Sequence, residues 1–168
     1  MNTFDCILKR RSIRKFKNQK VEEEKITKLL KAAMAAPSAK NTLPWEFYVV
    51  KSEEIKEKIK LISPAYGYNP DIMIIVGYDV NNTLSKSSFD FAFEDCTAAL
   101  ENILLEATEL GLGSVWCGIY PKEDRVAAIQ EALGVKPNII PLGLVEIGYP
   151  DEEKEPRTQY NESKVHIL

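Results

Sequence analysis

The sequence contains very little histidine and cysteine, which limits the chemistry that it can carry. Its single histidine, His166, lies two residues from the last residue, so a metal cluster or a Ser-His-Asp arrangement with an internal imidazole is excluded. The three cysteines, Cys6, Cys96 and Cys117, show no paired spacing, so neither a disulfide framework nor a zinc site is indicated. We therefore expect no metal site.

The common patterns for nucleotide binding and membrane insertion are also missing. No Gly-x-Gly-x-x-Gly follows a strand-like run, and no Walker-type phosphate loop occurs. No apolar run approaches the length that crosses a bilayer, and residues 1–5 do not have the character of a signal peptide. We expect a cytoplasmic protein with no membrane partner.

The overall composition is that of an ordinary globular protein. The chain has 168 residues, of which 45% are apolar and 28% are charged, enough to bury one substantial core. We therefore expect a single domain over residues 1–168. Helical and strand-like segments are mixed without strict βαβ alternation, which favours an α+β fold built on a sheet.

The formal net charge of −3 conceals a strong asymmetry. Residues 1–20 carry seven basic groups against one acid, Asp5, a local balance of +6, so the remainder of the chain carries −9. The basic groups are Lys9, Arg10, Arg11, Arg14, Lys15, Lys17 and Lys20. This distribution, with no stacking aromatic residues exposed among the basic ones, argues against a nucleic-acid partner and for one focused anion site.

The densest cluster of these groups is residues 10–16, Arg-Arg-Ser-Ile-Arg-Lys-Phe. Guanidinium groups bind phosphate oxygens two at a time, and a serine hydroxyl adds a neutral donor. Before the cluster, Phe4, Ile7 and Leu8 repeat with helical spacing, as on a helix that packs on a core. On residue chemistry alone, a phosphate or anionic-cofactor site and a plain charged helix end are equally well supported.

A second candidate is the small-residue stretch 35–41, Ala-Ala-Pro-Ser-Ala-Lys-Asn. Such a composition is usual for a turn. It is also suited to a backbone that approaches a flat ligand closely, with Ser38 and Asn41 supplying directional hydrogen bonds. The residues themselves leave both interpretations open.

Hydrophobic periodicity predicts the remaining elements. We expect helices over residues 21–36, 52–63 and 89–110 and from residue 121, and strands over 44–50, 72–76, 114–120 and 139–147. In the last strand, Pro141 and Gly143 mark a bulge or an edge. The apolar stripe of the 89–110 helix is too broad for a surface element, so this helix is central or at a subunit contact. From Tyr149 on, the chain should be an extended polar arm whose apolar end, 165–168, needs a covering surface such as another subunit.

The order of these motifs resembles the nitroreductase family of FMN-dependent oxidoreductases over nearly the whole chain. The motifs that carry the resemblance are Arg-Arg-Ser-Ile-Arg at 10–14, Ala-Pro-Ser-Ala-Lys-Asn at 36–41, Pro-Trp at 44–45, Gly-Leu-Gly-Ser-Val-Trp at 111–116, Pro-Leu-Gly at 141–143, Gly-Tyr-Pro at 148–150 and Pro-Arg at 156–157. Each motif is weak alone, whereas all of them in this order are specific.

The resemblance implies a fold, a cofactor and a reaction. The fold would be α+β, with a central mostly antiparallel or mixed sheet flanked by helices, in an intertwined homodimer with an extended C-terminal arm. FMN would be bound at the subunit interface and would carry the chemistry, so that no side chain is catalytic. NADH or NADPH would give a hydride to FMN, and a nitroaromatic, a quinone or a related small acceptor would take up the electrons in a second step, by a ping-pong mechanism.

The resemblance also implies roles for particular residues. Arg10, Ser12 and Arg157 would bind the phosphate, and Arg11 and Arg14 would bind the ribityl chain and the pyrimidine edge. A second set would come from the other subunit and contact the ring system: Pro37, Ser38, Ala39 and Asn41. Trp116, Cys117 and Gly118 match the segment whose backbone reaches the centre of the flavin.

Two departures from the family and several alternatives bear on these expectations. Larger members have an extra helical excursion that walls the substrate site, and only the 79–88 loop could replace it here. Lys154 could stand in for a basic residue often found next to Arg157.

Cys117 is a redox-active thiol or, more simply, a small buried residue. Three tyrosines line the open face of the flavin or only pack: Tyr66, Tyr68 and Tyr120. A flavin-binding sensor, store or scaffold without turnover would have the same motifs.

Overall fold

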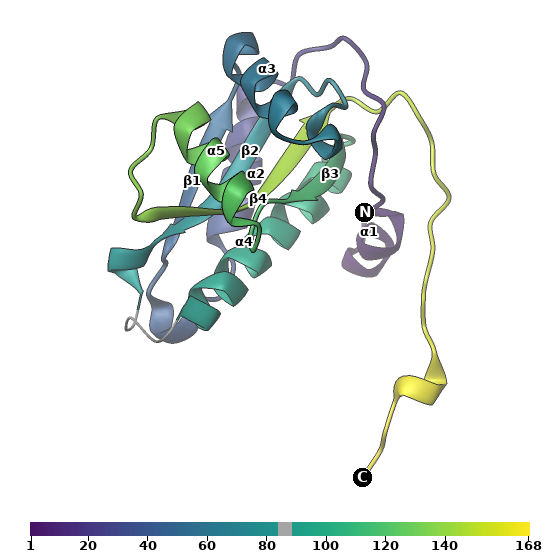
Figure 1. The fold of residues 1–168 in the computed structure, drawn as a ribbon. Helices are drawn as coiled ribbons and strands as arrows, with labels where there is room; N and C mark the ends of the chain where they lie inside the picture. Colours follow the sequence, from purple (N-terminus) through teal and green to yellow (C-terminus); the bar gives the residue numbers. More distant parts are fainter. Residues whose placement is uncertain (84–88) are drawn as a thin grey trace.

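The computed structural model describes residues 1–83 and 89–168, and it contains a four-stranded sheet (Figure 1). The strands are β1 (Trp45–Val50), β2 (Ile72–Asp79), β3 (Gly113–Gly118) and β4 (Ile139–Gly148). Their spatial order is β1-β2-β4-β3, and all three pairings are antiparallel. The expected α+β sheet is therefore confirmed in its antiparallel form.

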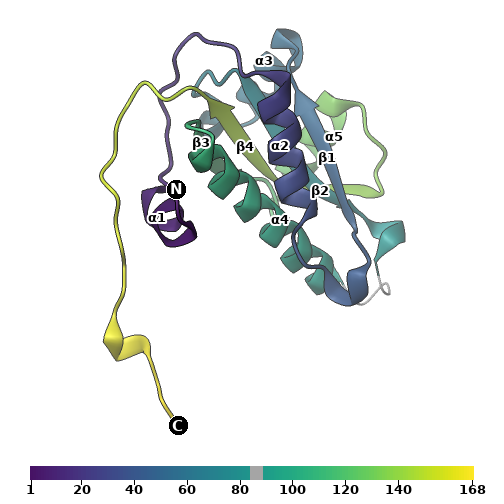
Figure 2. The ribbon, with the colours of Figure 1, turned by 180° about the vertical axis from the view of Figure 1, so that it is seen from behind.

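Helices cover both faces of the sheet. The helices are α1 (Thr3–Lys9), α2 (Glu23–Met34), α3 (Glu53–Ile62), α4 (Phe89–Glu109) and α5 (Glu123–Leu133). Short 3-10 turns are η1 (Ala39–Asn41), η2 (Pro64–Tyr66), η3 (Val80–Asn82) and η4 (Glu162–Lys164). Helices α3 and α5 lie on the face turned toward the viewer in Figure 1, and α2 and α4 lie on the opposite face, seen in Figure 2. The result is a three-layer arrangement with the sheet in the middle.

The apolar residues of β2 contribute side chains to a hydrophobic core on each side of the sheet. Because side chains alternate along a strand, Ile74 and Val76 belong to the core under α2 and α4, whereas Met73 and Ile75 belong to the core under α3 and α5. All four are fully buried. The strand predicted over residues 72–76 is confirmed, and its continuous hydrophobicity is explained by the helices on both sides of the sheet.

Strand β4 shows how a proline is accommodated inside a sheet. β4 lies between β2 and β3, so the alternative that Pro141 and Gly143 mark an edge is wrong. The other alternative, a bulge, is confirmed: Val76 pairs with Gly143 and Gly77 pairs with Pro141, which leaves Leu142 as an extra residue on β4. A bulge interrupts the ladder at the place where proline has no N–H to donate.

Helix α1 differs from the expectation in the side that it buries. Phe4 is 67% exposed and Ile7 is 48% exposed, so the expected core face of this helix is open. The buried residue is Cys6, whose thiol donates to the carbonyl oxygen of Leu105 on α4 at 3.3 Å. Met34 on α2 is also exposed. Apolar periodicity identifies a helix face that is suited to burial, but no part of the same chain buries the apolar face of α1 within the described residues.

The residues after β4 leave the three layers. In Figures 1 and 2 this segment, drawn in yellow, runs past α1 and continues away from the sheet. The backbone N–H of Arg157 donates to the carbonyl oxygen of Leu8 at 3.2 Å, which ties the segment to the end of α1. Beyond that point, Val165, Ile167 and Leu168 at the apolar tip are exposed.

Candidate functional site

The arginine-rich stretch runs along the open edge of the sheet. Ser12 forms a parallel bridge with Ser114 of the edge strand β3, and the N–H of Ile13 donates to the carbonyl oxygen of Ser114 at 2.9 Å. The side chain of Ile13 packs on Gly113, where an added Cβ would lie 2.7 Å from an Ile13 methyl carbon. Because the bridge is parallel, the path from Arg10 to Arg14 follows the direction of β3.

Cationic side chains gather at the start of this edge. Arg10 pairs with Glu101 of α4 at 3.3 Å, and Glu101 has a pKa that burial raises and the nearby Arg10 partly lowers. Nη1 of Arg11 donates to the carbonyl oxygen of Glu155. The bond between Arg157 and Leu8 brings a further arginine to the same end of α1. Four of the predicted residues, Arg10, Arg11, Ser12 and Arg157, are therefore held in one region.

Lys154 adds another cation to this region. Its ammonium donates to the carbonyl oxygen of Ser12 at 2.5 Å and pairs with Glu152 at 3.3 Å. Glu152 also accepts from the N–H of Arg14 at 2.6 Å, and this backbone bond is the main reason that the pKa of Glu152 is lowered. We call Arg10, Ser12, Lys154 and Arg157 the anion end of the site.

Farther along the edge, β3 directs some of its peptide groups away from β4. The carbonyl oxygens of Ser114 and Gly118 accept bonds from groups outside the sheet, so both peptides face away from β4. In an antiparallel pair, alternate residues face the same side, so Trp116, which lies between them, also directs its N–H and C=O outward. Gly118 is exposed, and a Cβ added to it would meet open space. The protein itself does not need a glycine there, whereas a closely approaching ligand would.

A shallow aromatic hollow adjoins this backbone. It has a volume of about 270 Å³ and is lined by Phe93, Trp116, Gly118, Tyr120 and Leu142. The rings of Phe93 and Tyr120 are tilted by 57° with their centres 5.7 Å apart, a favourable geometry for an aromatic pair. Both rings remain partly exposed, at 37% and 43%. The hollow thus offers flat apolar surface beside outward backbone donors.

Tyr66 and Arg125 hold this end of β3 in place. The hydroxyl of Tyr66 donates to the carbonyl oxygen of Gly118 at 2.8 Å, and Nη1 of Arg125 donates to the same oxygen at 2.9 Å. Burial raises the pKa of Tyr66, although Arg125 opposes the rise, so the hydroxyl keeps its proton. Tyr66 is fully buried and does not line an open face. No local signal in the sequence distinguishes Arg125 from the other charges of an amphipathic helix.

Cys117 faces away from the hollow. Its thiol belongs to the core under α3 and α5 and donates to the carbonyl oxygen of Ala65 at 3.0 Å. Burial raises the pKa of this thiol to about 12, with Glu146 adding to the rise, so a reactive thiolate is disfavoured. The interpretation of Cys117 as a small buried residue is confirmed, and only its backbone is near the free edge. Arg14 is exposed, with its guanidinium 5.7 Å from the ring centre of Tyr68.

The predicted turn at 37–41 is not brought to this edge by the same chain. The N–H of Ala39 donates to Oδ1 of Asp95 on α4 at 2.9 Å. Phe93, which lines the hollow, is two residues from Asp95, or about 200° around the helix. The hollow and the turn therefore lie on different sides of α4. Pro37, Ser38, Ala39 and Asn41 are grouped together but separated from the arginine-rich stretch.

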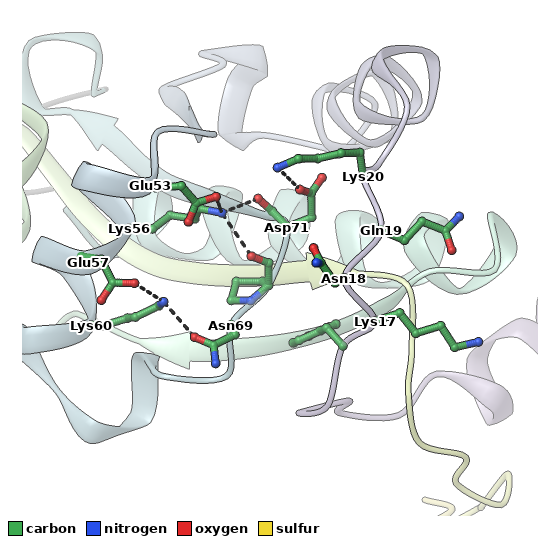
Figure 3. A pocket seen from close by; sticks show the side chains of 12 residues that line it. Lys17, Asn18, Gln19, Lys20, Glu53, Lys56, Glu57, Lys60, Asn69 and Asp71 are labelled. Atoms are coloured by element: carbon green, nitrogen blue, oxygen red, sulfur yellow. Dashed lines mark hydrogen bonds and ion pairs between the residues drawn. The ribbon is translucent and has the colours of Figure 1, made fainter.

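A polar cavity of about 330 Å³ lies between α3 and residues 16–20, and its charges are largely paired (Figure 3). Lys20 pairs with Asp71 at 2.8 Å, Lys56 with Glu53 at 2.8 Å, and Lys60 with Glu57 at 2.5 Å. Lys56 also donates to the carbonyl oxygen of Asp71 at 2.8 Å, so Asp71 joins the segment after the arginine-rich stretch to α3. The paired lysines make this cavity a weaker candidate for an anion than the edge of β3.

Two further classes of site are not found in the described part of the chain. Among residues 1–83 and 89–168, no three His, Cys, Asp or Glu side chains are grouped so that they could hold a metal ion. In the same residues, no helix combines the length and the apolar character that crossing a membrane requires. Residues 84–88 of the 79–88 loop, the only segment expected to be able to replace the helical excursion of larger members, lie outside the described residues.

Taken together, the fold and the edge of β3 define a class of protein. It is a three-layer α+β protein in which one sheet edge has cationic donors at the arginine end and flat apolar surface at the aromatic hollow. Comparison with known proteins makes this class specific. The family model described as Nitroreductase family matches residues 7–65 and 68–149.

Individual proteins agree with the family match. A protein of Archaeoglobus fulgidus with the provisional name NADH dehydrogenase/NAD(P)H nitroreductase is 43% identical over 168 residues, which cover 95% of this chain and 94% of that protein. A solved structure from Parabacteroides distasonis with the same provisional name has a TM-score of 0.92 and 36% identity, and covers 99% of this chain and 98% of that one. An FMN-dependent nitroreductase from Clostridium difficile has a TM-score of 0.85 and 34% identity, with 98% of both chains covered.

This chain belongs to the nitroreductase family. The resemblance carried by its motifs is therefore confirmed.

Proposed function

We propose that this chain is an FMN-dependent oxidoreductase that takes a hydride from NADH or NADPH and passes electrons to nitroaromatics, quinones or related small acceptors. The observation that supports this most strongly is the line of groups along β3. Cationic donors at the anion end are followed by outward backbone N–H groups and then by the aromatic hollow. FMN has a phosphate, a polar chain and a flat ring in the same order.

The anion end suits the phosphate of FMN. In this proposal Arg10, Ser12 and Arg157 bind the phosphate, and Lys154 adds a fourth donor. Arg11 and Arg14 are placed for the ribityl chain and the pyrimidine edge. Charge-assisted hydrogen bonds from guanidinium groups to phosphate are among the strongest that a protein surface can offer.

The backbone near Gly118 suits the ring. FMN supplies the hydride acceptance and electron release, and the protein orients it. The outward N–H groups of Trp116 and Gly118 can donate to ring acceptors, and Tyr66 and Arg125 hold the Gly118 carbonyl so that this backbone keeps its position. In the ping-pong order that we propose, one exposed face of the bound ring serves both partners, so the nicotinamide leaves before the acceptor enters.

We also propose that the site is completed by a second copy of the chain in an intertwined homodimer. Pro37, Ser38, Ala39 and Asn41 cannot join the hollow of their own chain, because α4 separates them. The uncovered apolar side chains Phe4, Ile7, Met34, Ile167 and Leu168 support a subunit contact. An apolar tip on an exposed C-terminal arm gains stability when a partner surface covers it.

Two further features of the protein belong to the proposal. Both hydrophobic cores share one sheet, which supports a single domain over residues 1–168. All three cysteines are free and buried, which supports a reducing, cytoplasmic location.

The functional proposal predicts two separable half-reactions. The purified protein should be yellow, and heat should release a flavin that chromatographs as FMN. Under anaerobic conditions, NADH or NADPH should bleach the flavin absorbance, and menadione or a nitroaromatic added after removal of the nicotinamide should restore it. Protein that remains colourless after incubation with FMN would refute the proposal. Flavin that binds but resists both nicotinamides would instead indicate a sensor, store or scaffold.

The proposed homodimer predicts a sedimentation result. At low micromolar concentration the flavin-loaded protein should sediment as a dimer of 19.0-kDa chains, without a folded monomer. Obligate dimers rarely have a stable monomer, because the faces buried in the contact remain apolar when they are separated. A folded monomer that retains bound flavin would contradict the shared site.

A further inference from the structure

The turn after α2 has an uncommon backbone conformation. Three non-glycine residues have positive φ: Lys40 at 50°, Asn41 at 57° and Leu43 at 49°. Side chains with a Cβ rarely adopt this region, because the Cβ approaches the following carbonyl oxygen. Such a turn persists only when its surroundings hold it, and conformations of this kind cluster at functional sites.

Hydrogen bonds within the turn set its shape. The N–H of Asn41 donates to the carbonyl oxygen of Ser38 at 2.9 Å, and the N–H of Leu43 donates to the Ser38 hydroxyl oxygen at 3.1 Å. The hydroxyl of Thr42 donates to the carbonyl oxygen of Ala39 at 3.0 Å. These bonds link residues of the turn to one another, so they do not fix its place on the molecule.

Asp95 ties the turn to helix α4. This side chain, 7% exposed on α4, accepts the N–H of Ala39 on Oδ1 at 2.9 Å. Its other oxygen, Oδ2, is buried and has no hydrogen-bond partner within the described residues. A buried carboxylate with an unused oxygen is costly to keep. A smaller apolar residue would avoid that cost, so stability alone does not explain the aspartate.

We propose that Asp95 is a positioning residue that acts through Ala39 and holds the 38–43 turn against α4. The turn then presents the Ser38 hydroxyl and the Asn41 amide to the flavin ring bound by a second copy. The Ser38 oxygen accepts from Leu43, so its proton can be donated to a ligand, and the Asn41 side chain is exposed. This inference rests on the proposed function, because it assigns the turn to the FMN site.

Two substitutions at Asp95 separate positioning from simple stabilisation. Asp95→Ala removes the acceptor, and it should weaken binding of both FMN and riboflavin about tenfold, since the ring contact is common to both. Asp95→Asn keeps an amide oxygen that can accept from Ala39, and it should bind both flavins like the parent protein. Affinities would be measured by quenching of flavin fluorescence in protein freed of its flavin.

Thr97→Val is the matched control. The Thr97 hydroxyl is also buried on α4 and has no hydrogen-bond partner within the described residues, and nothing places it in contact with the turn. This variant should bind both flavins normally. If Asp95→Ala binds them normally too, or if Asp95→Asn is as weak as Asp95→Ala, the positioning role is refuted.

A variant of the turn itself keeps the test decisive if Asp95→Ala does not fold. Ala39→Pro removes the same N–H donor while leaving Asp95 intact. Ser38 is extended, with φ −137° and ψ 150°, and Ala39 begins η1, so the backbone accepts proline at this position. The same loss of affinity is expected, and unchanged binding would overturn the inference. Parent protein that binds no FMN would instead refute the proposed function.

Discussion

Replacing Arg157 with alanine should weaken FMN binding roughly ten- to a hundredfold while leaving riboflavin binding nearly unchanged. The side chain is exposed, and it forms no ion pair within the described residues, while its backbone is fixed to Leu8 beside the anion end. A charge-assisted hydrogen bond contributes about 1.5–3 kcal/mol, and riboflavin has no phosphate to receive it. Titration of flavin fluorescence with each ligand measures both affinities.

Arg14→Ala is the control for this discrimination. Its guanidinium is farther along the edge, over the ring of Tyr68, and should act on the part that FMN and riboflavin share. Both affinities should fall alike, and the reduction potential of the bound flavin should fall as well, because a nearby cation favours the charged reduced form. Equal damage to both ligands by Arg157→Ala, or discrimination by phosphate in Arg14→Ala, would show that the roles are assigned wrongly.

The free energy of unfolding of the parent protein should fall as the pH rises, and replacing Glu146 with glutamine should abolish this pH dependence. Glu146 is fully buried in β4, and neither carboxylate oxygen has a hydrogen-bond partner within the described residues. Burial raises its pKa from 4.5 to about 7, and the nearby N–H of Tyr68 and the ammonium of Lys60 offset part of the rise. The folded protein therefore binds this proton more tightly than the unfolded chain does.

The direction of the pH effect follows from that difference. The stabilisation by protonated Glu146 is fully present below pH 4.5 and is lost as the pH rises through 7. Between pH 5 and pH 8 it should decrease by about 2.5 kcal/mol, and Glu146→Gln should not show this decrease. Urea unfolding at several pH values measures it. Glu153→Gln, at an exposed position, should follow the parent curve; parallel curves for Glu146→Gln and the parent would contradict the expectation.

The parts of the fold that the sequence predicts well are those whose neighbours leave a local pattern. The unbroken apolar run of β2 requires cover on both faces, and the arginine-rich stretch becomes specific in the order of motifs that carries the family resemblance. Helix α1 is different, because Phe4 and Ile7 have the periodicity of a buried face whether their cover comes from the same chain or from another. A sequence pattern specifies that a face is apolar, but it does not specify what packs on it.

The candidate site shows the same limit. The proposed roles of Arg10, Ser12 and Arg157 come from the motifs that carry the family resemblance, whereas the roles of Tyr66 and Arg125 depend on a contact with Gly118. Tyr66 lies 52 positions before Gly118 in the sequence, and Arg125 lies 7 positions after it. Asp95 was missed for a similar reason: its partner is a backbone N–H, which every residue except proline has, so the sequence cannot identify it.

The open edge of β3 has a consequence for the newly made chain. Proteins usually protect an edge strand with a charged side chain or a proline, because unpaired N–H and C=O groups invite pairing with other chains. If FMN binds at Trp116 and Gly118 as proposed, such protection would also exclude the ligand, and the bound flavin would cover the edge in its place. The solubility of the newly made chain would then depend on the supply of flavin.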